Sequence, residues 1–225
     1  GLADTKMGAA AGGGERVHRR AKLAAAAGYH AVDKMVKSGM VLGVGTGSTV
    51  GYVLERLAER IKSGALREIS AVPTSETTSK ELKRLGIPAH TADSNAPIDL
   101  AIGSADAVDE EGNIVKGGKG ALLREKLVQE SAKICVVCID DSKLCAKIGA
   151  SFPIPVEITS TFAQRTVRRI AALPSLMGCD ARLRHGTAPA GLPGSTDTMT
   201  PFLTDNGNMI VDLFLQRPLT DVAAA

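Results

Sequence analysis

The chain lacks tryptophan, and its aromatic residues are limited to two tyrosines and four phenylalanines. A sugar held by stacking on aromatic rings is therefore not expected, whereas backbone amides and lysines suit a phosphorylated ligand. No basic block is interleaved with aromatic residues and the net charge is only +3, so nucleic acid is not an expected partner. No apolar run approaches the roughly 18 residues that span a bilayer, so no membrane partner is expected either.

Cysteine is also scarce, with four residues in a chain of 225, and two of them have the spacing C-x-x-C. That spacing can indicate a metal site or a redox pair. Cys135 and Cys138, however, lie in the apolar run 134–139, which is typical of a buried strand, and residues three apart in a strand point to opposite faces. We therefore expect buried thiols and a reducing compartment, and we assign no metal ligands.

The first 150 residues alternate short apolar runs with longer amphipathic segments. The pattern predicts helices over 15–38, 50–63, 76–85 and 119–131, and strands over 40–44, 69–72, 88–91, 99–102 and 133–139. Ser75 can cap the third helix, and Gly86 can end it. The alternation predicts an α/β fold, with a parallel sheet and helices on both faces. Ligands of such sheets bind beyond the carboxyl ends of the strands.

The composition changes near residue 150. Phe152-Pro-Ile-Pro155 indicates a domain boundary, and a strand, a helix and an exposed loop are expected over 156–158, 161–173 and 186–200. Asp205-Asn-Gly-Asn208 lies between the apolar runs 202–204 and 209–213, which predicts a β-hairpin.

The N-terminal end is different again, because an Ala/Gly-rich tract covers residues 8–14 and favours a mobile segment. The chain also begins with Gly1, as a processed or truncated N-terminus would. We therefore expect a flexible N-terminus over 1–18, a catalytic domain over 19–150 and a small α+β domain over 151–225.

The segment that carries most chemistry runs from Lys116 to Lys126 and reads KGGKGALLREK. It places a lysine, a run of glycine amides and Glu125 within ten residues, and free amides at the start of a helix favour negative charge. A cation, bare amides and a carboxylate suit proton transfer next to an oxyanion. The glycine turn 45–49 and the loop 103–106 also follow predicted strands, so we expect all three segments to meet at one edge of the sheet.

Each of these residues also has a simpler interpretation. Glu125 could be a solvated helix carboxylate, Lys116 a surface lysine and Asp106 a turn cap. The glycines of the turn 45–49 could serve only its geometry, and its hydroxyls could cap a helix. That turn lacks the third glycine of G-x-G-x-x-G, which disfavours dinucleotide binding.

Four segments carry the most specific pattern of the chain. They are Gly43-Val-Gly-Thr-Gly-Ser-Thr49, Val72-Pro-Thr-Ser75 with Leu85-Gly-Ile-Pro88, Ala105-Asp106 followed by Lys116–Lys126, and Thr204-Asp-Asn-Gly-Asn208. In order and spacing they resemble the type A ribose-5-phosphate isomerases over roughly residues 22–219. The resemblance implies a Rossmann-like domain plus a small α+β domain, and interconversion of D-ribose 5-phosphate and D-ribulose 5-phosphate through an enediol. It also implies no cofactor, no metal, a homodimer or larger homo-oligomer, and the cytoplasm or the plastid stroma.

The resemblance further implies roles for single residues. Glu125 matches the base that moves a proton between C1 and C2, and Asp106 matches an acid that handles hydroxyl protons. Lys116 and the amides of Gly117 and Gly118 match the groups that stabilise the enediolate oxygens. The other substrate-binding positions are Thr46, Gly47, Ser48, Thr49, Gly103, Ser104, Ala105, Lys119 and Lys143.

The chain departs from the family pattern at several positions. Gly103 replaces the first aspartate of the usual Asp-Gly-Ala-Asp, Ala107 replaces an acidic residue, and Lys119 replaces a glycine. Family members also continue with a helix and a strand beyond the end of this chain. The alternative hypothesis is therefore a catalytically impaired relative that serves as a structural or binding subunit of an assembly.

Overall fold

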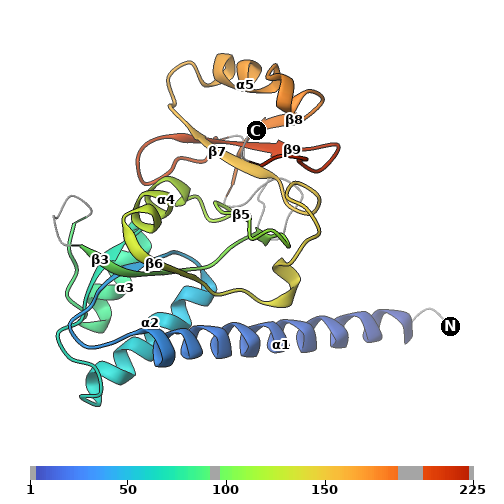
Figure 1. Ribbon diagram of the computed structural model, residues 1–225. Coiled ribbons are helices and arrows are strands. Elements are labelled where there is room, and N and C mark those ends of the chain that lie inside the picture. The colour runs from blue at the N-terminus through green and yellow to red at the C-terminus, as the bar shows by residue number, and fades with distance from the viewer. Residues whose placement is uncertain (1–3, 92–96, 187–199, 223–225) are drawn as a thin grey trace.

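The computed structural model describes residues 4–91, 97–186 and 200–222, and their side chains from residue 18 onward. The elements form a parallel sheet between helices and a second, antiparallel sheet with its own helix (Figure 1). The helices are α1 (Asp4–Met35), α2 (Ser48–Lys62), α3 (Glu76–Leu85), α4 (Leu122–Glu130) and α5 (Ala163–Ala171), with short 3-10 turns at Asp141–Lys143 and Pro174–Leu176. The strands are β1 (Val41–Val44), β2 (Ser70–Pro73), β3 (Ile98–Gly103), β4 (Ala107–Val108), β5 (Ile114–Val115), β6 (Ala132–Val137), β7 (Ile154–Ile158), β8 (Asp180–Leu183) and β9 (Met209–Phe214).

The parallel sheet has the strand order β2-β1-β3-β6, and all of its neighbouring strands run in the same direction. Val44 at the end of β1 is in register with Ile102 near the end of β3. The turn after β1 and the loop after β3 therefore begin side by side, as the sequence predicted. The α/β fold class is confirmed.

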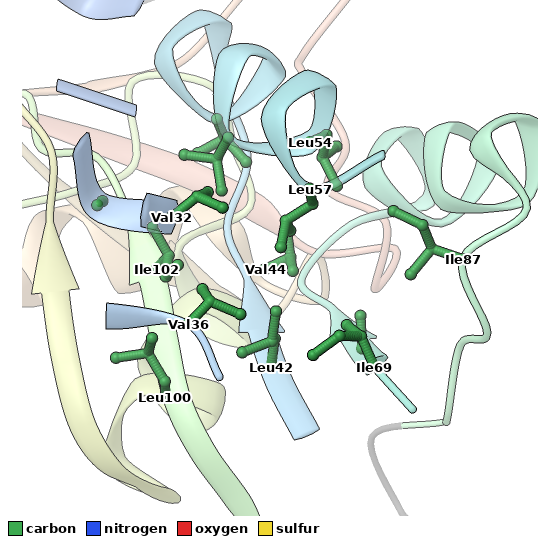
Figure 2. Close-up of a cluster of buried hydrophobic side chains, with 14 of the residues drawn as sticks. Val32, Val36, Leu42, Val44, Leu54, Leu57, Ile69, Ile87, Leu100 and Ile102 are labelled. Carbon is green, nitrogen blue, oxygen red and sulfur yellow. The ribbon is translucent and has the colours of Figure 1, made fainter. Parts of the chain in front are cut away.

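One face of this sheet packs on α1 and α2 and forms the main core, whose side chains converge in Figure 2. Leu42 and Val44 of β1, Leu100 of β3 and Leu57 of α2 belong to this cluster, and each of these four residues is at most 1% exposed. Burying a side chain of this size stabilises the fold by about 1.5–3 kcal/mol. Apolar runs without alternation, such as Val41–Val44, are typical of strands that are covered on both faces.

The other face of the sheet is covered by α4 (Figure 1). Val128 of α4 packs against Val72 and Ile98. A Cβ atom on Gly43 would lie 2.5 Å from Cγ1 of Val128, so only glycine lets the helix approach β1 this closely. This close approach brings the first turn of α4 to the end of β1, where the active-site residues are expected.

The antiparallel sheet has the order β7-β9-β8 and packs its apolar side chains against α5. Val211 and Leu213 of β9 are at most 2% exposed and form the centre of this second core. A short hairpin of β4 and β5 connects the loop after β3 with α4.

Several sequence-based boundaries are confirmed. Helix α3 spans Glu76–Leu85 as predicted, and Ser75 caps it by accepting a hydrogen bond from the Thr78 amide at 3.1 Å. Gly86 ends the helix with a left-handed φ of 70°.

Other boundaries differ. Helix α1 begins at Asp4 instead of residue 15, and residues 88–91 contribute only an isolated bridge between Ala71 and Ala89. Helix α4 begins at Leu122 instead of 119, since Gly117 and Gly120 have positive φ angles that a helix does not contain. Most of the expected loop 186–200 lies outside the described residues.

The predicted hairpin around residues 205–208 is wrong in its pairing. The turn forms, because the Gly207 amide donates to the Thr204 carbonyl at 2.9 Å. Residues 202–204, however, form no strand, and β9 pairs with β7 and β8 instead. The Asn-Gly signal is local, whereas the partners of β9 come from distant parts of the chain.

The prediction of two buried thiols is half correct. Cys138 is 5% exposed, but Cys135 is exposed on β6. Among the described strands, β6 pairs only with β3 and so forms an edge of the sheet. An apolar run does not distinguish an edge strand from a central one.

Candidate active site

The turn after β1 reaches across the edge of the sheet to the first turn of α4. The amide of Thr46 donates to Oε1 of Glu125 at 3.0 Å, and the Thr46 hydroxyl bonds to Oγ of Ser75 at 2.8 Å. A Cβ atom on Gly45 would lie 3.0 Å from Cα of Gly103, so glycine lets the two strand ends pass closely. The glycines of this turn therefore serve both its geometry and its proximity to Glu125.

Glu125 is the most deeply buried acid of this region, with 2% of its side chain exposed. It lies in the first turn of α4, because the helix begins at Leu122 and not at the predicted residue 119. Lys116 forms an ion pair with it, with 2.9 Å between Nζ and Oε1. The sequence predicted that this carboxylate, this amine and the glycine amides share one pocket, and the structure brings the first two into contact.

The surroundings of Glu125 act on its pKa in opposite directions. Burial raises the pKa above its ordinary value, and the charge of Asp106 raises it further. The Lys116 ammonium and the Thr46 amide lower it, but burial is the largest influence. A carboxyl group with a raised pKa exchanges protons more readily near neutral pH than an ordinary glutamate does.

The loop after β3 holds Asp106 against the glycine segment. Oδ2 of Asp106 accepts a hydrogen bond from the Gly118 amide at 2.7 Å. Nζ of Lys116 lies 3.5 Å from Oγ of Ser104. The Gly118 amide is thus already bonded, and Asp106 would have to release it before that amide could bind a substrate oxygen.

A cavity of about 90 Å³ opens between these segments. Ten predicted site residues line it: Thr46, Gly47, Ser48, Thr49, Ser104, Ala105, Asp106, Lys116, Lys119 and Lys143. Ligand pockets usually exceed about 300 Å³, so the cavity must widen to admit a pentose phosphate. Three of the lining residues are lysines, whose long side chains can move without a change of the backbone.

Four predicted residues do not line the cavity, namely Gly103, Gly117, Gly118 and Glu125. Glu125 adjoins it, because two lining residues, Thr46 and Lys116, are bonded to its carboxylate. Gly103 faces α4, where a Cβ atom would lie 3.1 Å from Nε2 of Gln129.

Three residues that line the cavity were not predicted from the sequence, namely Cys138, Ile139 and Asp140. They directly follow β6, so the rule that ligands bind beyond the carboxyl ends of strands would have found them. Asp140 lies 3.8 Å from Nη2 of Arg20, which extends from α1 to the mouth of the cavity.

Two departures from the expected pattern have structural explanations. Ala107 belongs to β4, is 2% exposed and packs with Val115 and Ile148, so a carboxylate at this position would be buried among apolar groups. Lys119 is exposed and its side chain lines the cavity, where it adds positive charge.

The described residues contain neither a metal-binding cluster nor a helix that could span a membrane. No three His, Cys, Asp or Glu side chains are grouped there so that they could bind a metal ion together. No described helix combines the length and the hydropathy that crossing a bilayer requires.

Comparison with known proteins identifies the family. The family model of ribose 5-phosphate isomerase A (phosphoriboisomerase A) matches residues 70–225. The chain belongs to the ribose 5-phosphate isomerase A family. Members of this family interconvert ribose 5-phosphate and ribulose 5-phosphate, a step of the pentose phosphate pathway. The predictions of family, reaction and fold class are thereby confirmed.

Similar proteins come from distant organisms. Ribose-5-phosphate isomerase of Plasmodium falciparum is 37% identical over 195 residues, which are 86% of this chain and 78% of that protein. A probable ribose-5-phosphate isomerase of Arabidopsis thaliana, described as chloroplastic, is 39% identical over 191 residues, 84% of this chain and 66% of its own.

Solved structures of isomerases have the same fold. The structure from Plasmodium falciparum superimposes with a TM-score of 0.83 at 36% identity and covers 91% of this chain and 83% of its own. A second D-ribose-5-phosphate isomerase, solved in complex with phospho-erythronic acid, has a TM-score of 0.79 at 30% identity, with 89% and 81% covered.

Proposed function

We propose that Glu125 is the base of the isomerase reaction and that Lys116 stabilises the oxyanion. Glu125 removes the proton from C2 of the open-chain aldose, the electrons form the C1–C2 double bond, and O1 becomes an enediolate oxygen. A proton then moves from the C2 hydroxyl to O1, a transfer that is assigned to Asp106. The protonated carboxyl group returns its proton to C1 as O2 becomes the carbonyl oxygen, which gives the ketose. The observation that carries this assignment is the ion pair of 2.9 Å between a carboxylate that is 2% exposed and a lysine that lines the cavity.

Each group suits its role on physical grounds. One carboxyl group must alternate as base and acid, so a pKa raised by burial is favourable. Lys116 places a positive charge beside the site where negative charge develops, and a narrow cavity keeps water from the enediolate. Asp106 is proposed to handle hydroxyl protons.

The phosphate group is proposed to bind at the opposite end of the cavity. Ser48 and Thr49 offer hydroxyl groups there, and the amide groups at the start of α2 favour an anion. Lys143 and Lys119 line the same cavity and add two positive charges. The solved relative with bound phospho-erythronic acid shows that an acid phosphate of this size binds to a protein of this fold.

The test is an isomerase assay with ribose 5-phosphate on the purified chain. We expect turnover by the wild type, and Glu125→Gln should lower kcat by about 10³-fold, since a proton-transfer group contributes about 10²–10⁴. Glu130→Gln is the matched control, because Glu130 lies in the same helix, has 60% of its side chain exposed and forms a surface ion pair with Lys126.

Two outcomes would contradict the proposal in different ways. Full activity of Glu125→Gln would show that Glu125 is not the base, although the protein would still be an isomerase. A folded wild type without turnover would instead favour the alternative of a structural or binding subunit, which no similarity to known proteins supports.

We further propose two domains, 19–150 and 151–225, which follow an N-terminal segment 1–18, and assembly as a homodimer or larger homo-oligomer. Among the described strands, none belongs to both the parallel sheet and the antiparallel sheet, which supports the division into two domains. Leu127 of α4 is 55% exposed and Ile134 of β6 is 50% exposed, as expected for surfaces that another chain covers. A monomer in sedimentation equilibrium at micromolar concentration would contradict the assembly.

A further inference from the structure

A fully buried ion pair lies outside the cavity and has no part in the mechanism above. Arg184 follows β8 with 0% of its side chain exposed, and Asp212 of β9 is 1% exposed. Nε of Arg184 donates to Oδ2 of Asp212 at 2.9 Å, and Nη2 donates to Oδ1. The guanidinium group is therefore fixed by two parallel hydrogen bonds, the strongest arrangement that arginine makes with a carboxylate.

The third nitrogen of the same group holds the loop of the active site. Nη1 of Arg184 donates to the carbonyl of Gly117 at 2.7 Å and lies 3.4 Å from the carbonyl of Gly118. These two carbonyls directly follow Lys116 in the chain. The contact thus connects the antiparallel sheet with the lysine that pairs with Glu125.

The same loop is held at two further points. The Phe202 ring packs on Gly120, where a Cβ atom would lie 2.4 Å from Cζ, and the ring lies 6.0 Å from the Arg184 guanidinium. Asp106 accepts the Gly118 amide at 2.7 Å from the other side. Gly117 and Gly120 have φ angles of 119° and 84°, so this backbone needs external contacts to keep one conformation.

Stability alone gives little reason for a buried pair, because well-packed apolar residues of similar volume are often equally stable. The contact with the loop is what an apolar pair would lose. We propose that Arg184 is a positioning residue of the isomerase: held by Asp212, it fixes the backbone after Lys116 so that the amine stays on Glu125. This inference rests on the proposed roles of Lys116 and Glu125.

The experiment replaces the pair by an apolar one and compares it with a matched exposed pair. Arg184→Met with Asp212→Leu removes both charges together and so leaves neither unpaired. Arg182→Met with Asp180→Leu is the control, because this ion pair lies on β8 with more than half of each side chain exposed. Arg184→Lys is a second variant that keeps the charge but cannot bond Asp212 and Gly117 together in the same way.

We expect the apolar double variant to lower kcat for ribose 5-phosphate 10- to 100-fold while KM changes less than threefold, with circular dichroism unchanged. Arg184→Lys should fall between this variant and the wild type, and the control pair should match the wild type. An unchanged kcat in both Arg184 variants would overturn the proposal. If the double variant does not fold, Arg184→Lys alone decides.

Hydrogen–deuterium exchange separates this proposal from the proposed function. In the peptide that contains residues 116–121, exchange should be at least tenfold faster in the Arg184 variants and unchanged in the control. Equal exchange rates in the wild type and the Arg184 variants would overturn the proposed role of Arg184, whatever the activity of the variants. A wild type without turnover, or a fully active Glu125→Gln, would instead contradict the proposed function. In that case the exchange rates alone would test whether Arg184 holds the loop.

Discussion

An aspartate at position 103 should make the enzyme faster. The family resemblance places a carboxylate there, and Gly103 has no proton to give. The structure can accept the change, because Gly103 is not among the glycines with positive φ, and a Cβ atom would meet only Nε2 of Gln129, at 3.1 Å. That atom is the end of a flexible side chain on α4, so it needs to move by only a few tenths of an ångström.

The size of the effect follows from the neighbourhood of Gly103. Gly45 lies between Gly103 and Glu125: a Cβ atom on Gly45 would be 3.0 Å from Cα of Gly103 and 3.6 Å from Oε1 of Glu125. A carboxylate at position 103 would therefore be a neighbour of Glu125. Two close carboxylates raise the pKa of one of them, which keeps a proton available near neutral pH. A positioned proton-transfer group is worth about 10²–10⁴ at best. We expect about a tenfold rise in kcat, or about 1.4 kcal/mol, because Gln129 still crowds the site.

The assay is a cycle of four proteins: wild type, Gly103→Asp, Gln129→Ala and the double variant. kcat and KM are measured with ribose 5-phosphate, and thermal unfolding checks the fold. Removing the Gln129 amide should add a further two- to fivefold to Gly103→Asp. The reasoning is refuted if both variants with Asp are folded and no faster than the wild type. A tenfold loss in Gln129→Ala alone would show that the amide itself already performs the role assigned to the absent acid.

Three further predictions concern the same cavity and its supports. Glu125 must be ionised to act as a base and burial raises its pKa, so a pH profile of kcat/KM should fall on the acid side with a midpoint above the ordinary pKa range of glutamate. Lys116→Met should move this midpoint to higher pH, because the Lys116 ammonium lowers the pKa of Glu125. Lys143→Met should raise KM about tenfold with less than a threefold change in kcat, whereas Lys147→Met, at an exposed position, should change neither in a substrate titration. Ser75→Ala removes the cap of α3 and should cost about 1 kcal/mol, seen as a melting temperature about 2–4 °C lower.

Much of the site could be predicted because it is built from the ends of parallel strands. The turn after β1 and the loop after β3 are short and glycine-rich, and the register of Val44 with Ile102 places them together. Apolar runs and capping residues are local signals, so Ser75 and Gly86 fixed the limits of α3 correctly. The first turn of α4 was placed at this edge by the same rule, although its start was misjudged by three residues.

The contacts that could not be predicted join residues far apart in the sequence. Arg184 and Asp212 are 28 residues apart, and Arg184 lies 67 residues from the Gly117 carbonyl that it holds. No spacing or composition marks such a pair, because a buried arginine and an exposed one look alike in a sequence. The same limit explains Cys135, whose exposure depends on how many strands flank β6.

The burial of Glu125 depends on glycines that look like simple turn residues in the sequence. Burying a carboxylate is unfavourable unless it is paired and hydrogen-bonded, and Glu125 obtains both from Lys116 and the Thr46 amide. These partners reach it because Gly43 lets α4 lie close to the sheet and Gly45 lets the turn after β1 pass close to Gly103. A larger residue at Gly43 would push α4 away from the sheet, and one at Gly45 would push the turn away from Gly103; either change would disturb the contacts of the acid. Gly43 of β1 and Gly45 of the following turn are therefore as much a part of the proposed proton-transfer site as the acid itself.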